Sequence, residues 1–158
     1  MSRYYTRAEL KAARARWRAE AKRVVFTNGC YDILHPGHIR LLEQCRSMGD
    51  VLILALNTDA SVRRYKGPER PLNGEQRRVA LALALEAVDA VTLFDEDTPR
   101  ELIAEILPDI LVKGADWSHF VAGREEVEAA GGEVRLVALE AGYSTTRTVE
   151  EILREREP

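Results

Sequence analysis

VVFTNGCYDILHPGH, residues 24–38, joins a strand pattern to a helix pattern across one short turn. Its opening run, Val24–Thr27, is apolar or β-branched, which indicates a buried strand. Asn28-Gly29 interrupts the run, because glycine permits backbone angles and close approaches that other residues do not. His35 and His38 then precede a segment whose apolar residues recur with helical spacing. The stretch therefore predicts a helix that begins with two imidazoles, at an end where free N–H groups and the helix dipole attract anions.

The composition of the whole chain is that of a globular protein. The 158 residues are 46% hydrophobic and 31% charged and are most simply one domain. A net charge of -3 argues against a general nucleic-acid binder. No apolar run approaches the roughly 20 residues that span a membrane, and the N-terminus lacks the apolar core of a secretory signal. Cys30 and Cys45 are too few for a disulfide framework, so we expect a cytoplasmic protein that binds neither nucleic acid nor membrane.

An N-terminal helix is predicted over residues 6–21, with Thr6 and Glu9 at capping-box spacing. Basic residues recur on it every three or four positions. They are Arg3, Arg7, Lys11, Arg14, Arg18 and Lys22. Such a stripe is most often a solvated face, and an anionic partner or a subunit contact is the alternative. We therefore divide the chain into an N-terminal helix, residues 1–22, and one α/β domain, residues 23–158.

Strand and helix patterns alternate through the rest of the chain. After the first strand, further strands are predicted at 51–56, 91–94, 110–114 and 133–139. Helices are predicted after residue 38, at 73–86, from Pro99 with Thr98 as its N-cap, at 120–130 and at 146–156, and residues 59–72 predict a basic loop. This alternation predicts right-handed βαβ units, and hence a Rossmann-like, doubly wound, five-stranded parallel sheet covered on both faces.

Ligands bind such sheets beyond the carboxyl ends of the strands. Clusters of polar residues follow the ends of several predicted strands. They are Asn28 to His38, Asn57, Lys113 to Asp116, and Ser144 to Thr146. The sequence therefore predicts one ligand site at this edge of the sheet.

The chemistry of this site is narrowed by what the sequence lacks. Neither GxGxxG nor GxxxxGK[ST] occurs, which argues against an NAD-type site and a P-loop. Nothing with zinc spacing accompanies His35 and His38, so we expect no metal held by the protein itself, and capping of the helix is the structural alternative for the pair. Nucleotidyl transfer to a phosphate acceptor fits the remaining groups. It needs positioning and electrostatic stabilisation but no protein nucleophile, because the acceptor oxygen is already ionised.

FTNGCYDILHPGH, residues 26–38, resembles the HxGH signature of the nucleotidyltransferase superfamily. Further stretches are similar to the adenylyltransferases that make ADP-heptose from heptose 1-phosphate and ATP. They include ALNTDASVRRYKGPERPLN at 55–73, DEDTP at 95–99, ILPDILVKGADW at 106–117 and GYSTTR at 142–147. The likeness covers roughly residues 22–152 and implies the nucleotidyltransferase type of α/β fold for the domain at 23–158.

The resemblance also implies roles for individual residues. His35 and His38 are expected to contact the triphosphate and stabilise the transition state. Lys66 is expected to grip the acceptor phosphate, and Arg78 to face the substrate. Nucleotide-binding positions are expected at Thr27, Asn28, Gly29, Tyr31, Asp32, Gly37, Asn57, Lys113, Asp116, Ser144, Thr145 and Thr146, with Asp32 bracing the turn. Mg²⁺ is expected to bridge the phosphates with few protein ligands.

Structural alternatives stand beside three of these roles. Lys66 lies in a basic segment and Arg78 adjoins Arg77, so either could be a solvated side chain. The run from Ser144 to Thr146 could be a simple helix N-cap.

Two departures from related families bear on the substrates. Cytidylyltransferases for glycerol 3-phosphate or choline phosphate usually read RTEGIST, whereas residues 139–145 carry no arginine at their head. ADP-heptose synthases usually carry Gly-Gly-Asp-Tyr where residues 114–117 read GADW, and residues 118–124 also diverge. We therefore expect the choice of base and of sugar to lie in residues 114–124 and 139–147.

The resulting prediction is an enzyme that joins a sugar 1-phosphate, heptose 1-phosphate in the first instance, to the α-phosphate of ATP and releases pyrophosphate. One alternative is a transferase that uses CTP with glycerol 3-phosphate or another phosphorylated acceptor. Another is a nucleotide-binding sensor without turnover. The resemblance implies a possible homodimer. It also implies a separate sugar kinase, because the 23 residues before the first strand cannot hold the kinase domain often fused to this family.

Overall fold

The structure is a computed structural model that describes residues 1–154, with the side chain of Trp117 left out. The predicted last helix ended at residue 156 and the predicted domain at residue 158. Those final positions lie outside the described residues.

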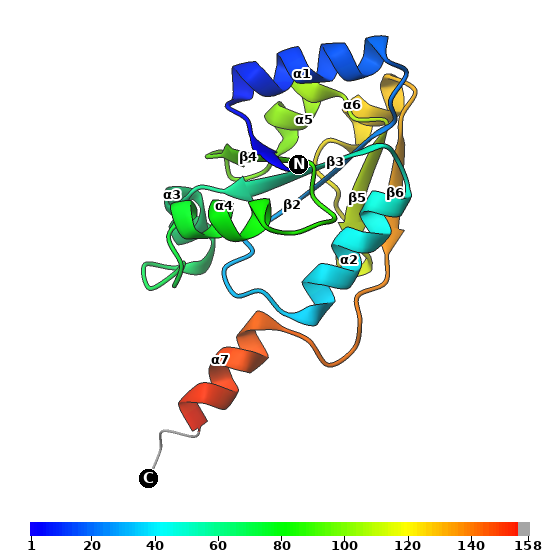
Figure 1. The fold of residues 1–158 in the computed structure, drawn as a ribbon. Helices are drawn as coiled ribbons and strands as arrows, with labels where there is room; N and C mark the ends of the chain where they lie inside the picture. The colour runs from blue at the N-terminus through cyan, green and yellow to red at the C-terminus, as the bar shows by residue number, and fades with distance from the viewer. Residues whose placement is uncertain (155–158) are drawn as a thin grey trace.

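Six parallel strands form one sheet in the order β1-β4-β3-β2-β5-β6 (Figure 1). They are β1 (Arg3–Tyr4), β2 (Val24–Gly29), β3 (Val51–Asn57), β4 (Ala90–Phe94), β5 (Ile110–Gly114) and β6 (Glu133–Val137). The predicted doubly wound parallel α/β fold is confirmed, but the count of five strands is wrong. The additional strand is β1, which pairs Arg3 with Ala90 at the sheet edge and is too short to carry a periodic pattern.

Helices cover both faces of this sheet (Figure 1). They are α1 (Arg7–Ala19), α2 (Pro36–Ser47), α3 (Asp59–Lys66), α4 (Glu75–Leu83), α5 (Arg100–Ile106), α6 (Arg124–Ala129) and α7 (Thr145–Arg154), with a short 3₁₀ helix at Ala115–Trp117. One core cluster joins β2 and β3 to α1, α5 and α6, and a second joins them to α2 and α4. Because β3 is buried along its whole length, its sequence is almost wholly apolar.

The strand order reverses beside β2, which positions the site. β3 and β4 lie on one side of β2, and β5 and β6 lie on the other. A crevice therefore opens at the carboxyl ends of β2 and β5, where ligands bind in sheets of this kind. None of the helices in the described part of the chain is both long and apolar enough to cross a bilayer.

Three predicted elements differ in detail. The expected loop at 59–72 begins as helix α3, because Thr58 caps it by accepting a hydrogen bond from the Ser61 amide at 3.1 Å, and the helix ends at Gly67, whose φ is 98°. Pro99, not Thr98, is the N-cap of α5, and no side chain caps that helix. The helix predicted to reach residue 86 ends at Leu83.

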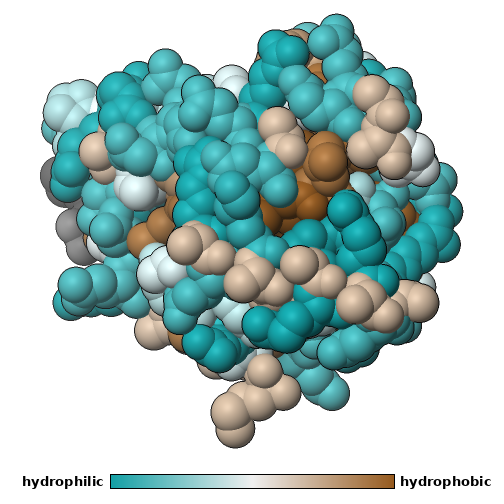
Figure 2. Space-filling view, turned by 90° about the horizontal axis from the view of Figure 1, so that it is seen from above, coloured by the Kyte–Doolittle hydropathy of each residue, from teal (hydrophilic) through white to brown (hydrophobic). Residues whose placement is uncertain are grey.

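The basic stripe of α1 is only partly solvated. Arg14 is buried, and its Nη2 donates to the Leu107 carbonyl at 2.8 Å and to Asp109 Oδ1 at 3.0 Å. Arg7 and Lys11 pair with Glu105 on α5. The expectation of a solvated face is therefore wrong at Arg14, which supplies donors to the carbonyls at the end of α5, whereas Lys11 is exposed as expected. Figure 2 looks down on the α1 side and shows that the outer surface there is mostly hydrophilic.

Candidate active site

Two adjoining cavities lie at the carboxyl ends of the strands, with volumes of about 450 Å³ and 190 Å³. Predicted site residues line the larger one: Asn28, Gly29, His35, Gly37, His38, Asn57, Lys66, Lys113, Asp116, Ser144, Thr145 and Thr146. The smaller cavity adds Thr27, Tyr31 and Asp32. Among the described residues, Arg78 is the one predicted site residue that lines neither cavity. Residues far apart in the sequence thus meet in one place.

His35 and His38 cap helix α2 reciprocally. The His38 amide donates to His35 Nδ1 at 3.3 Å, and the His35 amide donates to His38 Nδ1 at 3.4 Å. The two rings stack with centroids 3.7 Å apart. Because each Nδ1 is an acceptor, each neutral ring carries its proton on Nε2. The pair therefore offers two Nε2–H donors to the cavity that both rings line.

Burial keeps both imidazoles uncharged at neutral pH. It lowers the pKa of His38 to about 4, and the positive charges of His35 and Lys66 act in the same direction. Burial also lowers the pKa of His35. The rings therefore act as neutral hydrogen-bond donors. An arriving polyanion would raise both pKa values, because a negative charge favours the imidazolium.

The histidine pair continues into a column of four stacked or tilted rings. Tyr31 lies against His38 with centroids 4.7 Å apart, and Tyr143 lies against His35 at 5.9 Å. Gly37 makes room for the outer part of this column, since a Cβ there would lie 3.1 Å from both the His35 ring and Tyr143 Cβ. The column links the start of α2 to the segment that leads into α7.

The turn after β2 shows why Asn28-Gly29 occurs there. A Cβ on Gly29 would lie 2.8 Å from Tyr31 Cε2, so only glycine lets that ring fold back over the strand end. Asn28 Oδ1 is buried and accepts no hydrogen bond from the described residues. A buried acceptor without a partner is costly, and this one lies where a ligand could supply the donor.

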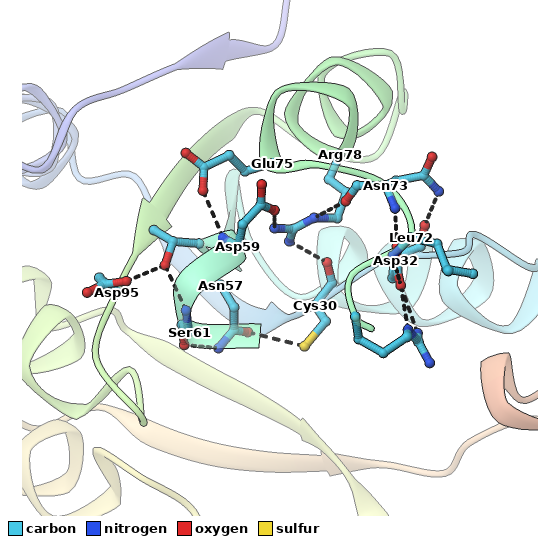
Figure 3. A network of polar contacts seen from close by, with 12 residues as sticks. Cys30, Asp32, Asn57, Asp59, Ser61, Leu72, Asn73, Glu75, Arg78 and Asp95 are labelled. Atoms are coloured by element: carbon cyan, nitrogen blue, oxygen red, sulfur yellow. Dashed lines mark hydrogen bonds and ion pairs between the residues drawn. The ribbon is translucent and has the colours of Figure 1, made fainter. Parts of the chain in front are cut away.

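Asp32 ties this turn to residues 70–73. Its buried carboxylate accepts from the Asn73 amide at 2.7 Å, the Leu72 amide at 2.9 Å and Arg70 Nε at 2.8 Å (Figure 3). Burial alone would raise the pKa of Asp32, but the bonds from Asn73, Leu72 and Arg70 outweigh it and hold the pKa below its usual range. The carboxylate is therefore ionised and acts as a brace, although it also lines the smaller cavity.

Arg78 lies beneath the site and is buried. Its three nitrogens donate to the Asn73 carbonyl, the Cys30 carbonyl and Asp59 Oδ1, each at 2.9 Å (Figure 3). The guanidinium thus connects α4 to the turn after β2 and to the start of α3. The structure does not bring Arg78 to the cavity as a substrate-facing group, and its contacts are those of a positioning residue.

Two lysines approach the cavities, one from strand β5 and one from helix α3. Lys113 lies at the end of β5, where burial lowers its pKa to about 8 although Asp116 and Cys30 act in the opposite direction. Lys66 is the last residue of α3 and is exposed, with Nζ 6.0 Å from the centroid of the Tyr65 ring. Lys113 is therefore held in the wall of the cavities, whereas Lys66 lies exposed at their edge.

Ser144, Thr145 and Thr146 surround the start of α7, which projects away from the body of the molecule (Figure 1). Thr145 Oγ1 donates to the Ile33 carbonyl at 3.4 Å, which joins this start to the histidine turn. Ser144 Oγ accepts from the Arg147 amide at 3.4 Å, as a helix-capping hydroxyl does. The alternative of an N-cap therefore applies to Ser144, while all three residues also line the cavity.

Comparison with known proteins bears on what this arrangement is. Residues 26–151 match the model of the cytidylyltransferase-like family. The chain belongs to this family. The expectation of a nucleotidyltransferase is thereby confirmed at the level of the family.

Curated relatives of this cytidylyltransferase-like chain are longer than it is. The bifunctional protein HldE of Azorhizobium caulinodans is 56% identical over 145 residues, which are 91% of this chain and 30% of that protein. The chain accordingly spans about 30% of the length of the curated relatives it matches.

Two solved structures share the fold. The lipopolysaccharide core biosynthesis protein from Thermoplasma volcanium superposes with a TM-score of 0.62 at 30% identity, covering 75% of this chain and 97% of that one. The pantoate-beta-alanine ligase from Francisella tularensis has a TM-score of 0.66 at 14% identity, covering 98% and 80% of the two chains, and shows a common fold alone.

Several lining residues of the cytidylyltransferase-like site were not predicted from sequence. They are Leu41, Tyr65, Phe94, Asp97, Thr98 and Pro99. Cys30 lies within the predicted run from Asn28 to His38, and Phe120, Ala122, Leu139, Glu140 and Tyr143 lie within the stretches expected to choose base and sugar. Asp97 and Thr98 could have been found, because they follow a strand end as the other polar clusters do. They were instead interpreted as the start of a helix, with Thr98 as its N-cap. The aromatic and apolar residues carry no signal of their own, since exposure cannot be read from residue type.

No group of three His, Cys, Asp or Glu side chains within the described residues could hold a metal ion. Asp116 is an exposed acidic residue common to both cavities. A divalent ion at this site of the cytidylyltransferase-like chain would therefore depend on ligand oxygens supplied by the substrate.

Proposed function

We propose that this chain transfers the adenylyl group of ATP to a sugar 1-phosphate, with heptose 1-phosphate as the acceptor. An oxygen of the acceptor phosphate attacks the α-phosphorus of ATP, and the bond from that phosphorus to the oxygen bridging to the β-phosphate breaks. Pyrophosphate leaves and an ADP-sugar is formed. No proton must be removed from the acceptor, because its phosphate is ionised at neutral pH.

The observation that carries this proposal is the reciprocal cap of His35 and His38. Each Nδ1 accepts a backbone N–H, so both Nε2–H groups are held as donors at the start of α2. Donors fixed in this way favour the charge that develops on the oxygens of the α-phosphate, without reorganising during the reaction. Both rings line one cavity with Lys66, Lys113 and the Ser144–Thr146 segment, as polyanion binding requires.

We assign the remaining roles from position. Lys113 and the Ser144–Thr146 segment bind the β- and γ-phosphates and the leaving pyrophosphate. Lys66 binds the acceptor phosphate and the α-phosphate, since it is the last residue of α3 and its side chain is exposed. Asn28 and Gly29 contact the nucleotide at the turn, while Asp32 and Arg78 hold that turn in place. No side chain acts as a nucleophile.

Mg²⁺ fits this site only as an ion brought in by the triphosphate. It would be held mainly by phosphate oxygens, with Asp116 as the acidic side chain in its surroundings. When bound, it neutralises charge on the phosphates.

The choice of ATP and of a heptose rests on sequence similarity. The stretches at 55–73, 106–117 and 142–147 resemble heptose 1-phosphate adenylyltransferases, and residues 139–145 lack the leading arginine usual in glycerol 3-phosphate cytidylyltransferases. The solved relative at 30% identity is named for lipopolysaccharide core biosynthesis, which agrees with a sugar substrate. CTP is the second candidate nucleotide, because the matching family is described as cytidylyltransferase-like.

We further propose that the reaction takes place in the cytoplasm, where ATP is available. A separate sugar kinase would supply the sugar 1-phosphate. A homodimer also remains a proposal, and sedimentation of the purified chain tests it.

The test is a pyrophosphate-release panel that crosses the four NTPs with heptose 1-phosphate, glycerol 3-phosphate and other sugar phosphates. We expect turnover with ATP and heptose 1-phosphate. Turnover with CTP alone would overturn the adenylyl assignment. Tight ATP binding without turnover for any pair would favour a sensor over an enzyme, and His38→Ala serves as the background control.

A further inference from the structure

A third cavity, of about 530 Å³, lies at the amino ends of the strands, at the opposite end of the sheet from the site described above. Six charged residues line it and define what we name the amino-end cleft: Arg14, Arg18, Lys22, Arg23, Asp109 and Glu133. Arg23 and Asp109 directly precede β2 and β5, and Glu133 is the first residue of β6. The length of the strands therefore separates this cleft from the two histidines, and none of its residues takes part in the proposed reaction.

Positive charge predominates in the amino-end cleft, because its two carboxylates are already satisfied within the protein. Asp109 accepts from Arg14 through Oδ1 at 3.0 Å and from the Val24 amide through Oδ2 at 2.7 Å. Glu133 Oε1 accepts from both Arg23 and Arg135. Four cationic side chains and two carboxylates leave a local charge of +2, in a chain whose net charge is -3.

Arg14 is fixed in the wall of the cleft, and its side chain is only 6% exposed. Nε donates to the Ile106 carbonyl at 3.2 Å, and Nη2 donates to the Leu107 carbonyl at 2.8 Å and to Asp109. Nη1 has no partner among the described residues, and it is not one of their fully enclosed polar atoms. A guanidinium held through two of its nitrogens presents the third in a set direction, so little side-chain entropy is lost when an anion binds to it.

Two further cations of the cleft are available to the same anion. Arg18 follows Arg14 by one turn on the same face of α1, is exposed, and forms no hydrogen bond or ion pair within residues 1–154. Lys22 pairs with Glu20 at 2.7 Å, and both side chains are about half exposed. Such a surface pair contributes little to stability. Both cations can therefore turn toward an anion at Arg14 without giving up a buried contact.

We propose that the amino-end cleft binds a small phosphorylated sugar or polyol. Guanidinium and ammonium groups are suited to phosphate, and the bidentate fork of arginine is especially so. No aromatic side chain of the described residues lines the cleft, so nothing there stacks on a nucleotide base. Glu133 Oε2, which accepts no hydrogen bond from the described residues, is an acceptor for a ligand hydroxyl. The volume is that of a site for an organic metabolite.

Residue-resolved NMR of the full chain tests this site with three probes: glucose 6-phosphate, inorganic phosphate and adenosine monophosphate. Glucose 6-phosphate carries no phosphate on C1 and so is not the acceptor of the proposed reaction. It should shift the Nε–Hε signal of Arg14 and the amides of Lys22 and Gly131, with a dissociation constant of about 1 mM or below. Inorganic phosphate and adenosine monophosphate should shift the same signals with about tenfold weaker affinity or less.

Arg18→Met should weaken the binding of glucose 6-phosphate about tenfold, as the loss of one charged hydrogen-bond donor does. Arg16→Met is the matched control, because Arg16 is an exposed arginine of the same helix that does not line the cleft. Arg18→Met should also keep wild-type turnover in the pyrophosphate-release panel, so the failure of either proposal can be told from the failure of the other. Absence of shifts at Arg14, Lys22 and Gly131 with all three probes, or equal weakening by the two variants, would overturn the site. Tightest binding by adenosine monophosphate or by inorganic phosphate would overturn the assigned class of ligand.

Discussion

His35 and His38 stack with ring centroids 3.7 Å apart, and each ring accepts the backbone N–H of the other residue through Nδ1. Many active-site histidines are oriented by a separate carboxylate. Here the helix cap itself sets the tautomer, so the orientation of both donors is encoded within the four residues His-Pro-Gly-His. The catalytic geometry and the start of α2 therefore depend on the same hydrogen bonds.

Removal of one ring should affect rate far more than stability. We expect His38→Ala to lower kcat by about two orders of magnitude or more, as the loss of a fixed donor to a developing oxyanion does. Loss of its capping bonds should lower the free energy of unfolding by only about 1 kcal/mol. His38→Asn retains a hydrogen-bond donor, so its kcat should lie between those of the wild type and His38→Ala. Steady-state kinetics and denaturant unfolding of the three proteins check this, and a near-wild-type rate for His38→Ala would exclude that ring from the mechanism.

The buried imidazole also predicts how stability depends on pH. Burial lowers the pKa of His38 from 6.5 to about 4, so in this interval the unfolded chain binds a proton that the folded protein does not. Stability from this group is therefore complete above pH 6.5 and is lost as the pH falls toward 4. His35, whose pKa burial also lowers, acts in the same direction.

The measurement is the free energy of unfolding between about pH 7.5 and about pH 4.5 for wild type and His38→Gln. The wild type should lose more stability than the variant across this range. Equal losses would mean that the acid sensitivity comes from other groups.

A second pH effect is expected in nucleotide binding. Burial lowers the pKa of Lys113 to about 8, and a triphosphate favours the charged ammonium. ATP affinity should therefore be full below pH 8 and decrease as the pH rises through that value, with proton uptake on binding. Lys113→Met should bind more weakly and lose this dependence. Calorimetry at about pH 8.5 in two buffers of different ionisation enthalpy measures the uptake, and none in the wild type would contradict the assignment.

Features that depend on neighbouring residues could be predicted from the sequence, whereas features that depend on distant residues could not. β3 is buried on both faces, so its first six residues, Val51–Leu56, form the continuous apolar run that is typical of a strand in a parallel sheet. The cavity residues from Asn28 to His38 lie within one motif and were expected together. β1 could not be predicted, because a two-residue strand acquires its role only by pairing with Ala90 and Val91.

Arg78 illustrates the opposite limit. It was expected to face the substrate, yet its partners come from residues 30, 59 and 73 and close around it only in the folded chain. The sequence shows two adjacent arginines at the start of a helix and nothing that tells which one is buried. Tertiary contacts, rather than local pattern, make Arg77 exposed and Arg78 buried.

This difference between neighbours supplies a prediction. Arg78→Met should lower the free energy of unfolding by about 3 kcal/mol, because it leaves the Asp59 carboxylate without its partner. Arg77→Met is the matched control and should stay within about 0.5 kcal/mol. Combining Arg78→Met with Asp59→Asn should recover part of the loss, as contacting residues do in a double-mutant cycle. A stable Arg78→Met protein with a strongly reduced kcat would instead support the substrate-facing role.

The outer ring of the histidine column should matter through its shape and not through its hydroxyl. Tyr143 lies over His35 at 5.9 Å, so Tyr143→Phe should keep kcat near wild type, whereas Tyr143→Ala should lower it about tenfold by loosening the ring that orients the donor. Burial is what lowers the pKa of His35, so the same truncation should raise that pKa toward its ordinary value, which NMR titration of the imidazole measures. Gly37→Ala, whose Cβ would lie 3.1 Å from both His35 and Tyr143, should displace the same pair and lower kcat without removing either ring. If Tyr143→Ala retains both the wild-type rate and the wild-type His35 pKa, the stack is only a surface contact and the two-histidine cap orients the donors unaided.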